Sequence, residues 1–323
     1  MAPPFQLTPA VFTALSRIEQ SLGRLQGLAV TQPQPLLRRR NRVRSVHASA
    51  AIEGNPLSAD QVTALLEGKR VLGREADLRE ILNVNEAYER LSKWKATSRH
   101  SLLEAHAVVM KGLLPNAGRF RTSSVGVFRG EQLTHLAPPA HLVSHQVDAL
   151  LRWLRRGDVP RLVAGCVVHY ELLFIHPFVD GNGRLARLWQ QVVHREHSPL
   201  LQFVPVESLI RERQRQYYAT LRQADRDGHC TRFLEFSLLA LADALTGFGQ
   251  DVRPERETAE ARLQTARAHF KRRWFSRGDY LALHVKLSTA TASRDLSAGV
   301  GARRLESRGQ RRLTEYRFPG SGG

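Results

Sequence analysis

The stretch FIHPFVDGNGRLARLW, residues 174–189, places a histidine, an aspartate and the triplet Gly-Asn-Gly between two apolar runs. Glycines permit a tight backbone in which successive N–H groups converge, and the apolar spacing after them predicts a helix from residue 184. Because the N-terminal end of a helix attracts anions, this turn predicts a phosphate site. Phe178 is expected to turn inward and anchor the loop in the core.

The charged side chains around the turn fit a phosphate ligand. Arg184 and Arg187 share one face of the predicted helix, where both guanidinium groups can bind phosphate oxygens. Asp180 offers the hard oxygen that Mg2+ on a nucleotide requires, and His176 can take up a proton near neutral pH. Each residue alone fits a capped loop, a core histidine or a solvated arginine better, but the set indicates phosphoryl or nucleotidyl transfer.

Helical spacing dominates the rest of the 323 residues, so a mostly α-helical protein is expected. In PLSADQVTALLEG, Ser58 and Gln61 indicate a helix start and Gly68 its end. Further helices are expected at 74–96, 101–113, 141–156, 160–174, 184–197, 207–225 and 231–248.

One segment, GRFRTSSVGVFRGEQLTHLAPPAHL at residues 118–142, departs from the helical pattern. Residues that favour strands flank Arg129-Gly130-Glu131 and a Pro-Pro pair follows, which predicts a short β-hairpin between helices. A single hairpin has little to pair with, so it could offer an edge to another strand.

The composition favours a soluble, cytoplasmic protein without a membrane span. Apolar residues make up 42% of the chain, but no run approaches the ~18 that a membrane helix needs. The N-terminus lacks the pattern of a signal peptide. Cys166 and Cys230 have no metal-ligand spacing, so buried free thiols are expected.

The formal net charge of +18 points to a polyanionic partner. Residues 253–323 hold 16 Lys or Arg against 7 Asp or Glu, which favours a nucleic-acid-binding tail, although codon usage could also enrich arginine. The polar segment GQDVRPERETAE, residues 249–260, is the expected domain boundary.

The run HPFVDGNGRLAR, residues 176–187, resembles the signature of the Fic family: His-Pro-Phe, any residue, Asp or Glu, Gly-Asn-Gly-Arg, two residues, Arg. The resemblance implies a helical Fic bundle with a β-hairpin flap, followed here by a small winged helix-turn-helix domain. It also implies transfer of AMP from ATP to a Ser, Thr or Tyr hydroxyl of a target protein or of the protein itself. Kinase-like relatives carry Lys where Gly183 stands, so Gly183 favours AMP transfer.

The resemblance also assigns roles within the motif. His176 would deprotonate the target hydroxyl, Asp180 would hold Mg2+, and Asn182 with the loop amides would bind the α-phosphate. Arg184 and Arg187 would bind the outer phosphates and stabilise the leaving pyrophosphate. The implied nucleotide-binding residues are Phe178, Gly181, Asn182, Gly183, Arg184, Arg187, Tyr217 and Tyr218. The two tyrosines correspond to a position near the adenine, although one of them fits the core equally well.

The hairpin resembles the Fic flap, which aligns a target segment by strand addition. Its arms would be Val125 to Phe128 and Thr134 to Pro139, and an ordinary surface hairpin is the alternative.

The stretch SAAIEG resembles the inhibitory motif of the family, through Ser49, Glu53 and Gly54. Glu53 would pair with Arg187 and deny it to the γ-phosphate. Without the resemblance, a helix end closed by Gly54 is the simpler interpretation. The preceding run RRRNRVR, residues 38–44, fits a solvated helix face better than a nucleic-acid arm.

The tail at residues 276–318 resembles a winged helix. Ser288 would cap its recognition helix, although two glycines interrupt the apolar end of that helix. DNA binding and contact with another protein remain alternative functions for this tail. The residues expected to face a groove or phosphates are Thr289, Thr291, Ser293, Arg294, Arg308, Arg311 and Arg312.

The expected domains are an N-terminal helical region at 1–70, a Fic core at 71–250 and a winged helix at 256–323. The expected activity is AMP transfer restrained by Glu53. Removal of AMP from a modified protein, and a DNA-binding regulator that senses nucleotide, remain alternatives, and a homodimer is left open.

Overall fold

The computed structural model describes residues 3–28, 33–124, 126–129, 132–252, 258–284, 287–310 and 313–319. The chain divides into two compact units, Met1–Pro254 and Glu255–Gly323, and the division falls within the polar segment 249–260. The described residues are mostly helical, as predicted, and each unit has a hydrophobic core of its own.

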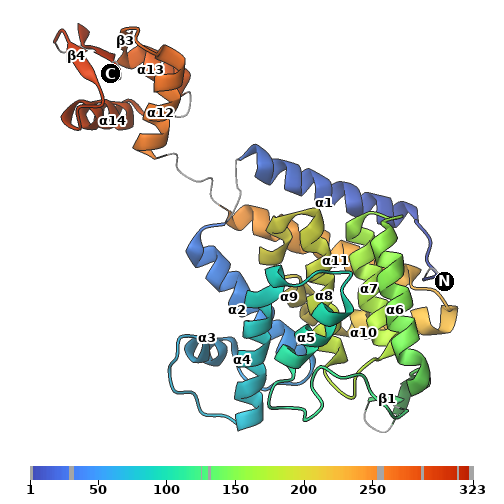
Figure 1. The fold of residues 1–323 in the computed structure, drawn as a ribbon. Coiled ribbons are helices and arrows are strands. Elements are labelled where there is room, and N and C mark those ends of the chain that lie inside the picture. The colour runs from blue at the N-terminus through green and yellow to red at the C-terminus, as the bar shows by residue number, and fades with distance from the viewer. Residues whose placement is uncertain are drawn as a thin grey trace. The chain divides into compact units, whose positions relative to one another are not determined.

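The first unit consists of helices and one β-hairpin (Figure 1). Its helices are α1 (Pro9–Gly27), α2 (Pro35–Ile52), α3 (Ala59–Leu66), α4 (Glu75–Arg90), α5 (Arg99–Val109), α6 (Ala140–Arg156), α7 (Arg161–Ile175), α8 (Asn182–His197), α9 (Val206–Glu212), α10 (Gln214–Asp227) and α11 (Thr231–Asp251). Two short 3-10 helices, η1 (Leu91–Lys93) and η2 (Pro199–Phe203), follow α4 and α8. The strands of the hairpin are β1 (Gly126–Arg129) and β2 (Gln132–Leu136).

Most of the predicted helices are present, with one clear error. The capping box at the start of α3 is confirmed, since Ser58 Oγ accepts from the Gln61 N–H and Gln61 Oε1 accepts from the Ser58 N–H. The single helix predicted at 207–225 is wrong, because the chain leaves helical geometry at Arg213 (φ −104°, ψ 28°) between α9 and α10. Arg213 binds Asp243 of α11 at 2.7 Å, a tertiary contact that apolar spacing does not reveal.

Helices α7 and α8 form the centre of the first unit and carry the motif between them. Most side chains of both helices are buried, and the two helices pack directly on each other. They approach closely at Gly165, where a Cβ atom would stand 2.3 Å from the His194 ring. The loop at residues 176–181 is therefore held between the two most deeply buried helices of the fold.

A buried carboxylate fixes α2 against this centre. Glu207 of α9 accepts hydrogen bonds from Ser45 Oγ of α2 at 2.8 Å and from Tyr88 Oη of α4 at 2.5 Å. Gln191 Nε2 of α8 donates to the same carboxylate at 2.7 Å, and burial raises the pKa of Glu207. Four helices thus meet at one side chain, so the end of α2 has a set position beside α8.

The basic run on α2 lies largely at the surface. Arg39 and Arg40 are more than half exposed and pair with Glu67 and Asp251. These ion pairs fit a helix face better than a nucleic-acid arm.

The second unit has the order helix, strand, helix, helix and two strands. Its elements are α12 (Ala259–Phe270), β3 (Phe275–Ser276), α13 (Arg277–Leu283), α14 (Thr289–Gly301), β4 (Glu306–Arg308) and β5 (Glu315–Arg317). The antiparallel strands lie in the order β3-β5-β4. Arg262 and Asp295 form a buried, bidentate ion pair at 2.6 and 2.9 Å that joins α12 to α14. Gly299 lets Leu305 pack on α14, because a Cβ there would stand 2.8 Å from Leu305 Cδ1.

Two further predictions concern the whole chain. Cys166 and Cys230 are free and buried, as predicted, and burial raises the pKa of each thiol to about 12. Among the described residues, no helix combines the length and apolar character that a bilayer crossing requires.

Candidate active site

The loop between α7 and α8 is bracketed by two residues in the left-handed region. His176 ends α7 with φ 49° and ψ 59°, and its N–H donates to the Leu172 carbonyl at 3.1 Å. Gly181 precedes α8 with φ 82°, and a Cβ atom there would also stand 2.6 Å from Met110 Sδ. A non-glycine residue at positive φ carries a conformational cost, so the surrounding contacts must hold His176 in place.

Asn182 closes this loop from inside. Its Oδ1 accepts from the Phe178 N–H at 3.0 Å, and its Nδ2 donates to the Phe178 carbonyl at 2.9 Å. Phe178 is fully buried, as expected from the sequence. The amide of Asn182, expected at the α-phosphate, is thus engaged by the loop backbone in this structure.

His106 supports the loop and was missed by the sequence analysis. Its ring stacks on Phe178 with centroids 3.6 Å apart and planes 8° apart. The Gly118 N–H donates to Nδ1 at 2.8 Å, so the ring proton lies on Nε2, 2.9 Å from the Asp180 carbonyl. Burial lowers the pKa of His106 to about 4. His106 lies on the apolar face of α5, where its position in the sequence does not distinguish it from other core residues.

The start of α8 faces the carboxylate of Glu53. The first N–H groups of a helix have no partners within the helix and attract anions. A Cβ atom on Gly183 would stand 2.4 Å from Glu53 Oε1 and 3.3 Å from Arg187 Nη1. Glycine is therefore needed for this close approach, and a carboxylate lies where the sequence predicts a phosphate.

Ser49, Glu53 and Arg187 meet as the resemblance implied. Arg187 Nη2 donates to Glu53 Oε1 at 2.7 Å and to the Ser49 carbonyl at 3.0 Å, while Nε lies 3.3 Å from Ser49 Oγ. The Arg187 side chain is 1% exposed. Burial alone would lower its pKa, but the Glu53 carboxylate raises it above the usual value. Gly54, with φ 94°, follows at the end of α2.

A relay of buried hydrogen bonds leads from Gln190 through His169 and Tyr217 to Arg187. Gln190 Oε1 lies 2.5 Å from His169 Nδ1, which must therefore carry the proton. His169 Nε2 then accepts from Tyr217 Oη at 3.0 Å, which leaves the phenol oxygen free to accept from Arg187. Burial lowers the pKa of His169 to about 3, so the relay stays neutral.

The two tyrosines have different environments. Tyr217 is 1% exposed and belongs to the core, which leaves it no open face for an adenine. Tyr218 is half-buried, and its Oη lies 3.4 Å from the Ile52 carbonyl at the end of α2. Gln214 Nε2 donates to the same carbonyl at 3.0 Å, so α10 contacts the segment that carries Glu53.

Arg184 is held by two carboxylates. Its Nη1 donates to Glu80 Oε1 at 2.6 Å, and its Nη2 lies 3.3 Å from Asp180 Oδ1. Glu80 was also missed by the sequence analysis, because it lies on α4, 104 residues before Arg184. Its second oxygen accepts from Asn55 Nδ2 at 2.8 Å, which links Arg184 to the residues just after Glu53.

Asp180 fits a Mg2+ ion that arrives with a nucleotide. Its side chain is 63% exposed, and Oδ1 also accepts from the Gly181 N–H at 2.6 Å. The described residues contain no group of three or more His, Cys, Asp or Glu that could hold a metal by itself. Mg2+ commonly binds one or two carboxylates together with substrate phosphates, which a single exposed aspartate satisfies.

The predicted hairpin is present beside this loop. β1 and β2 pair antiparallel, from Gly126 with Leu136 to Arg129 with Gln132, with an irregularity between Val127 and Phe128. Val125, the first residue of the predicted flap, lies outside the described residues.

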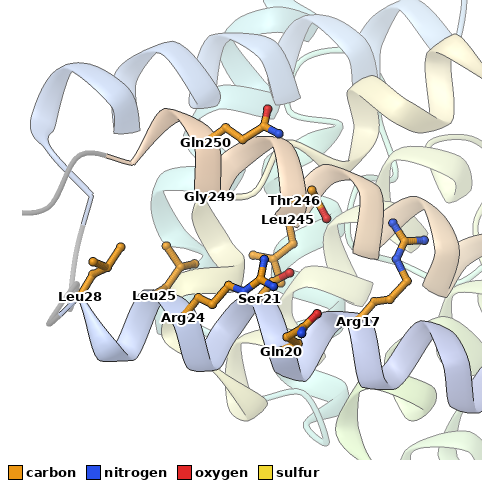
Figure 2. Close-up of a pocket in the computed structure, with 10 residues that line it drawn as sticks. All are labelled: Arg17, Gln20, Ser21, Arg24, Leu25, Leu28, Leu245, Thr246, Gly249 and Gln250. Carbon is orange, nitrogen blue, oxygen red and sulfur yellow. The ribbon is translucent and has the colours of Figure 1, made fainter.

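A pocket of about 440 Å³ lies away from these residues, between α1 and α11 (Figure 2). It is lined by Arg17, Gln20, Ser21, Arg24, Leu25, Leu28, Leu245, Thr246, Gly249 and Gln250. None of the predicted site residues lines it.

The second unit places some of its predicted residues at the surface. Ser288 caps α14 as predicted, accepting from the Thr291 N–H at 3.2 Å. Thr289 and Arg294 are exposed, whereas Thr291 and Ser293 are half-buried. Arg308 pairs with Glu315 and stacks over Trp274, with Cζ 4.2 Å from the ring centroid. Arg311 and Arg312 lie outside the described residues.

Comparison with known proteins identifies the family. The profile of the Fic/DOC family matches residues 96–193, which include the loop and most of α8. A crystal structure of a Fic family protein from Desulfovibrio desulfuricans G20 is 38% identical, with a TM-score of 0.75 over the whole of both chains. The chain belongs to the Fic family.

Curated Fic relatives carry the name of an activity. Protein adenylyltransferase fic-1 of Caenorhabditis elegans is 30% identical over 192 residues, which are 56% of this chain and 36% of that protein. Protein adenylyltransferase Fic of Nematostella vectensis is 30% identical over 203 residues, 59% of this chain and 45% of that protein. The match therefore covers less than half of each of these longer relatives.

Proposed function

We propose that this Fic protein transfers AMP from ATP to a Ser, Thr or Tyr hydroxyl of a target protein, and that Glu53 restrains the transfer. The observation that carries the proposal is the position of the Glu53 carboxylate. It lies 2.7 Å from Arg187 Nη2 and directly over Gly183, at the anion-attracting start of α8. The activity named for the curated relatives supports the same chemistry.

In the proposed reaction, His176 takes the proton of the target hydroxyl. The hydroxyl oxygen attacks the α-phosphorus of ATP, the bond from that phosphorus to the bridging oxygen breaks, and pyrophosphate leaves. The N–H groups at the start of α8 and the guanidinium groups of Arg184 and Arg187 stabilise the charge on the phosphates. Mg2+, held by Asp180 and phosphate oxygens, would neutralise part of this charge.

Restraint follows from competition for one guanidinium. Arg187 is buried and bound by Glu53, so a γ-phosphate must displace the carboxylate to reach it. When Glu53 stays, ATP can bind only with its phosphates displaced from the geometry needed for attack. A low basal rate that rises on removal of Glu53 is therefore expected.

The decisive experiment compares Glu53→Gly with its matched control, Glu67→Gly. Both glutamates follow a helix as its C-cap residue and precede a glycine at positive φ, but Glu67 pairs with surface cations. Intact mass is measured after incubation with Mg2+ and each nucleoside triphosphate, alone and with candidate protein acceptors. Glu53→Gly should gain a mass of AMP from ATP, the control should behave as the parent, and adding His176→Ala should abolish the gain.

The same experiment distinguishes the reverse reaction. If Glu53 instead positions water to remove AMP, the parent releases AMP from a modified protein and Glu53→Ala loses that release. Failure of both Glu53→Gly and His176→Ala to differ from the parent in either direction would refute a catalytic role for this site.

A second candidate function concerns the C-terminal unit. The order of α12, β3, α13, α14, β4 and β5 supports the proposal of a winged helix, and Lys271, Arg272 and Arg273 are exposed. We infer that this unit binds DNA mainly through phosphate contacts, since residues 253–323 hold 16 Lys or Arg against 7 Asp or Glu. Binding of the full chain to its own upstream DNA should weaken steeply with salt and be unaffected by His176→Ala. An absence of binding at low salt, with the unit folded, would exclude this role.

A further inference from the structure

Arg121 is a buried arginine whose side chain binds only carbonyl oxygens within the described part of the chain. Its residue is 3% exposed. Nε donates to the His176 carbonyl at 2.7 Å and Nη1 to the Ser123 carbonyl at 2.9 Å. Nη2 donates to the Pro138 carbonyl and, at 3.3 Å, to the Ile175 carbonyl.

The charge of Arg121 is compensated by a helix end. Ile175 and His176 lie at the C-terminus of α7, where carbonyl groups lack helical partners and carry the negative end of the helix dipole. Burial lowers the pKa of Arg121. The guanidinium nevertheless remains charged, since even a lowered arginine pKa stays far above neutral pH.

The four carbonyl groups come from two parts of the site. Ser123 and Pro138 flank the hairpin on its two sides, just before β1 and just after β2. Ile175 and His176 belong to the helix that presents the proposed base. The Arg121 N–H adds a further bond, to the Pro177 carbonyl at 3.0 Å. One planar, rigid group therefore ties both ends of the hairpin to the residue that carries the imidazole.

We propose that Arg121 is a positioning residue that fixes the distance between the hairpin edge and the His176 imidazole. This inference rests on the proposed function, in which a target strand adds to the hairpin and presents its hydroxyl to His176. A docked hydroxyl reaches the base only if the hairpin stands at a set distance from it. Arg121 sets that distance through the backbone, without touching nucleotide or target.

Arg121 should affect the two possible acceptors of AMP, a protein hydroxyl and water, to different extents. The proposed nucleotide site is formed by α8, Arg184 and Arg187, none of which contacts Arg121 in the bonds described above. A water molecule that attacks the α-phosphorus needs no docking on the hairpin, whereas a protein hydroxyl does. Loss of Arg121 should therefore impair transfer of AMP to protein more than transfer of AMP to water, which releases pyrophosphate without modifying a protein.

The test uses the full chain in the Glu53→Gly background. Arg121→Gln removes the guanidinium group, and Arg121→Lys keeps the positive charge at the end of α7. Arg119→Gln, which alters an exposed arginine two residues earlier, is the control. Circular dichroism and thermal unfolding establish that each variant is folded. The measurements are amide hydrogen exchange of β1 and β2, ATP affinity, pyrophosphate release and AMP incorporation by intact mass.

The expected result for Arg121→Gln and Arg121→Lys is faster exchange in β1 and β2, with AMP incorporation lowered about 10- to 100-fold. ATP affinity and pyrophosphate release should stay within about twofold, and Arg119→Gln should match its parent in every measurement. Unchanged exchange in the hairpin, or a parallel loss of incorporation and pyrophosphate release, would overturn the inference. If the Glu53→Gly parent transfers no AMP, the proposed function fails, and exchange in the hairpin still decides whether Arg121 holds it.

Discussion

The carboxylate of Glu53 lies so close to Gly183 that an alanine there would place its Cβ 2.4 Å from Glu53 Oε1. The two residues are 130 positions apart in the chain, and each has a reason to be at this point. Gly183 lies in the first turn of the helix that attracts anions, and Glu53 is an anion that also pairs with Arg187. A single contact thus combines the proposed phosphate site with its proposed inhibitor.

Gly183→Ala should weaken the Glu53–Arg187 pair. The new methyl group displaces the carboxylate and leaves a buried guanidinium without it, at a cost of about 1–3 kcal/mol in the free energy of unfolding. In a Glu53→Gly background the same methyl no longer meets the carboxylate, and the nearest remaining neighbour is Arg187 Nη1 at 3.3 Å, so the two changes should not add. Urea unfolding of both single variants and the double variant measures this coupling. Gly247→Ala, which meets nothing within 4 Å, is the control, and additive effects would contradict the prediction.

Glu80→Gln should destabilise the protein because Glu80 is the closest partner of the buried Arg184. The pair is 2.6 Å long and its side chains are 9% and 11% exposed, so removing one charge should cost about 3 kcal/mol. Glu75→Gln is the matched control on α4, since the Glu75 side chain is 85% exposed and its pair with Arg79 should contribute little. Chemical unfolding of the two variants should differ clearly, and equal effects would show that Glu80 is not needed for Arg184.

Tyr217→Phe should disturb Arg187 without touching Glu53. The change removes the hydroxyl group that donates to His169 and accepts from Arg187, which should cost about 1–3 kcal/mol. In the Glu53→Gly background it should raise the KM for ATP more than it lowers kcat, because Arg187 would be less well held for the γ-phosphate. Steady-state pyrophosphate release measures both constants. Tyr170→Phe, which removes a hydroxyl group that donates to Asp225 at 2.8 Å outside the site, should leave both constants nearly unchanged, and equal effects of the two variants would refute the relay.

Acid should destabilise the protein in part through His106. Burial lowers the pKa of His106 to about 4, whereas the unfolded chain binds a proton near 6.5. The unfolded state therefore binds more protons between these values, so the stability contributed by His106 is complete above pH 6.5 and is lost as the pH falls towards 4. His169 and His194 act in the same sense, while Glu171, whose pKa burial raises to about 7, acts in the opposite sense.

A variant isolates the His106 contribution. In His106→Gln the pH slope of the unfolding free energy should fall by about 1.4 kcal/mol per pH unit between pH 4.5 and 6, which corresponds to one proton. Urea unfolding across this range gives the slope, and His100→Gln, an exposed histidine of the same α5 helix, is the control. An unchanged slope in His106→Gln would mean that His106 binds its proton equally in both states.

Several features were predictable because local sequence determines them. The glycines around Asn182, the caps at Ser58 and Ser288 and the turn signals of the hairpin depend on nearby residues. The break at Arg213 was not predictable, because apolar spacing continues across it and the bend depends on a contact with Asp243.

The sequence by itself determined the helical class, the loop at residues 176–187 and the family resemblance, since spacing and turn chemistry act within a few residues. The resemblance implied the pair of Glu53 and Arg187, which the tertiary structure brings together across 134 residues. Only the tertiary structure decided that Glu80, His106 and Arg121 support the site. In the sequence these three have the pattern of ordinary core or surface residues. Their roles arise from hydrogen bonds between distant segments, and packing alone brings those segments together.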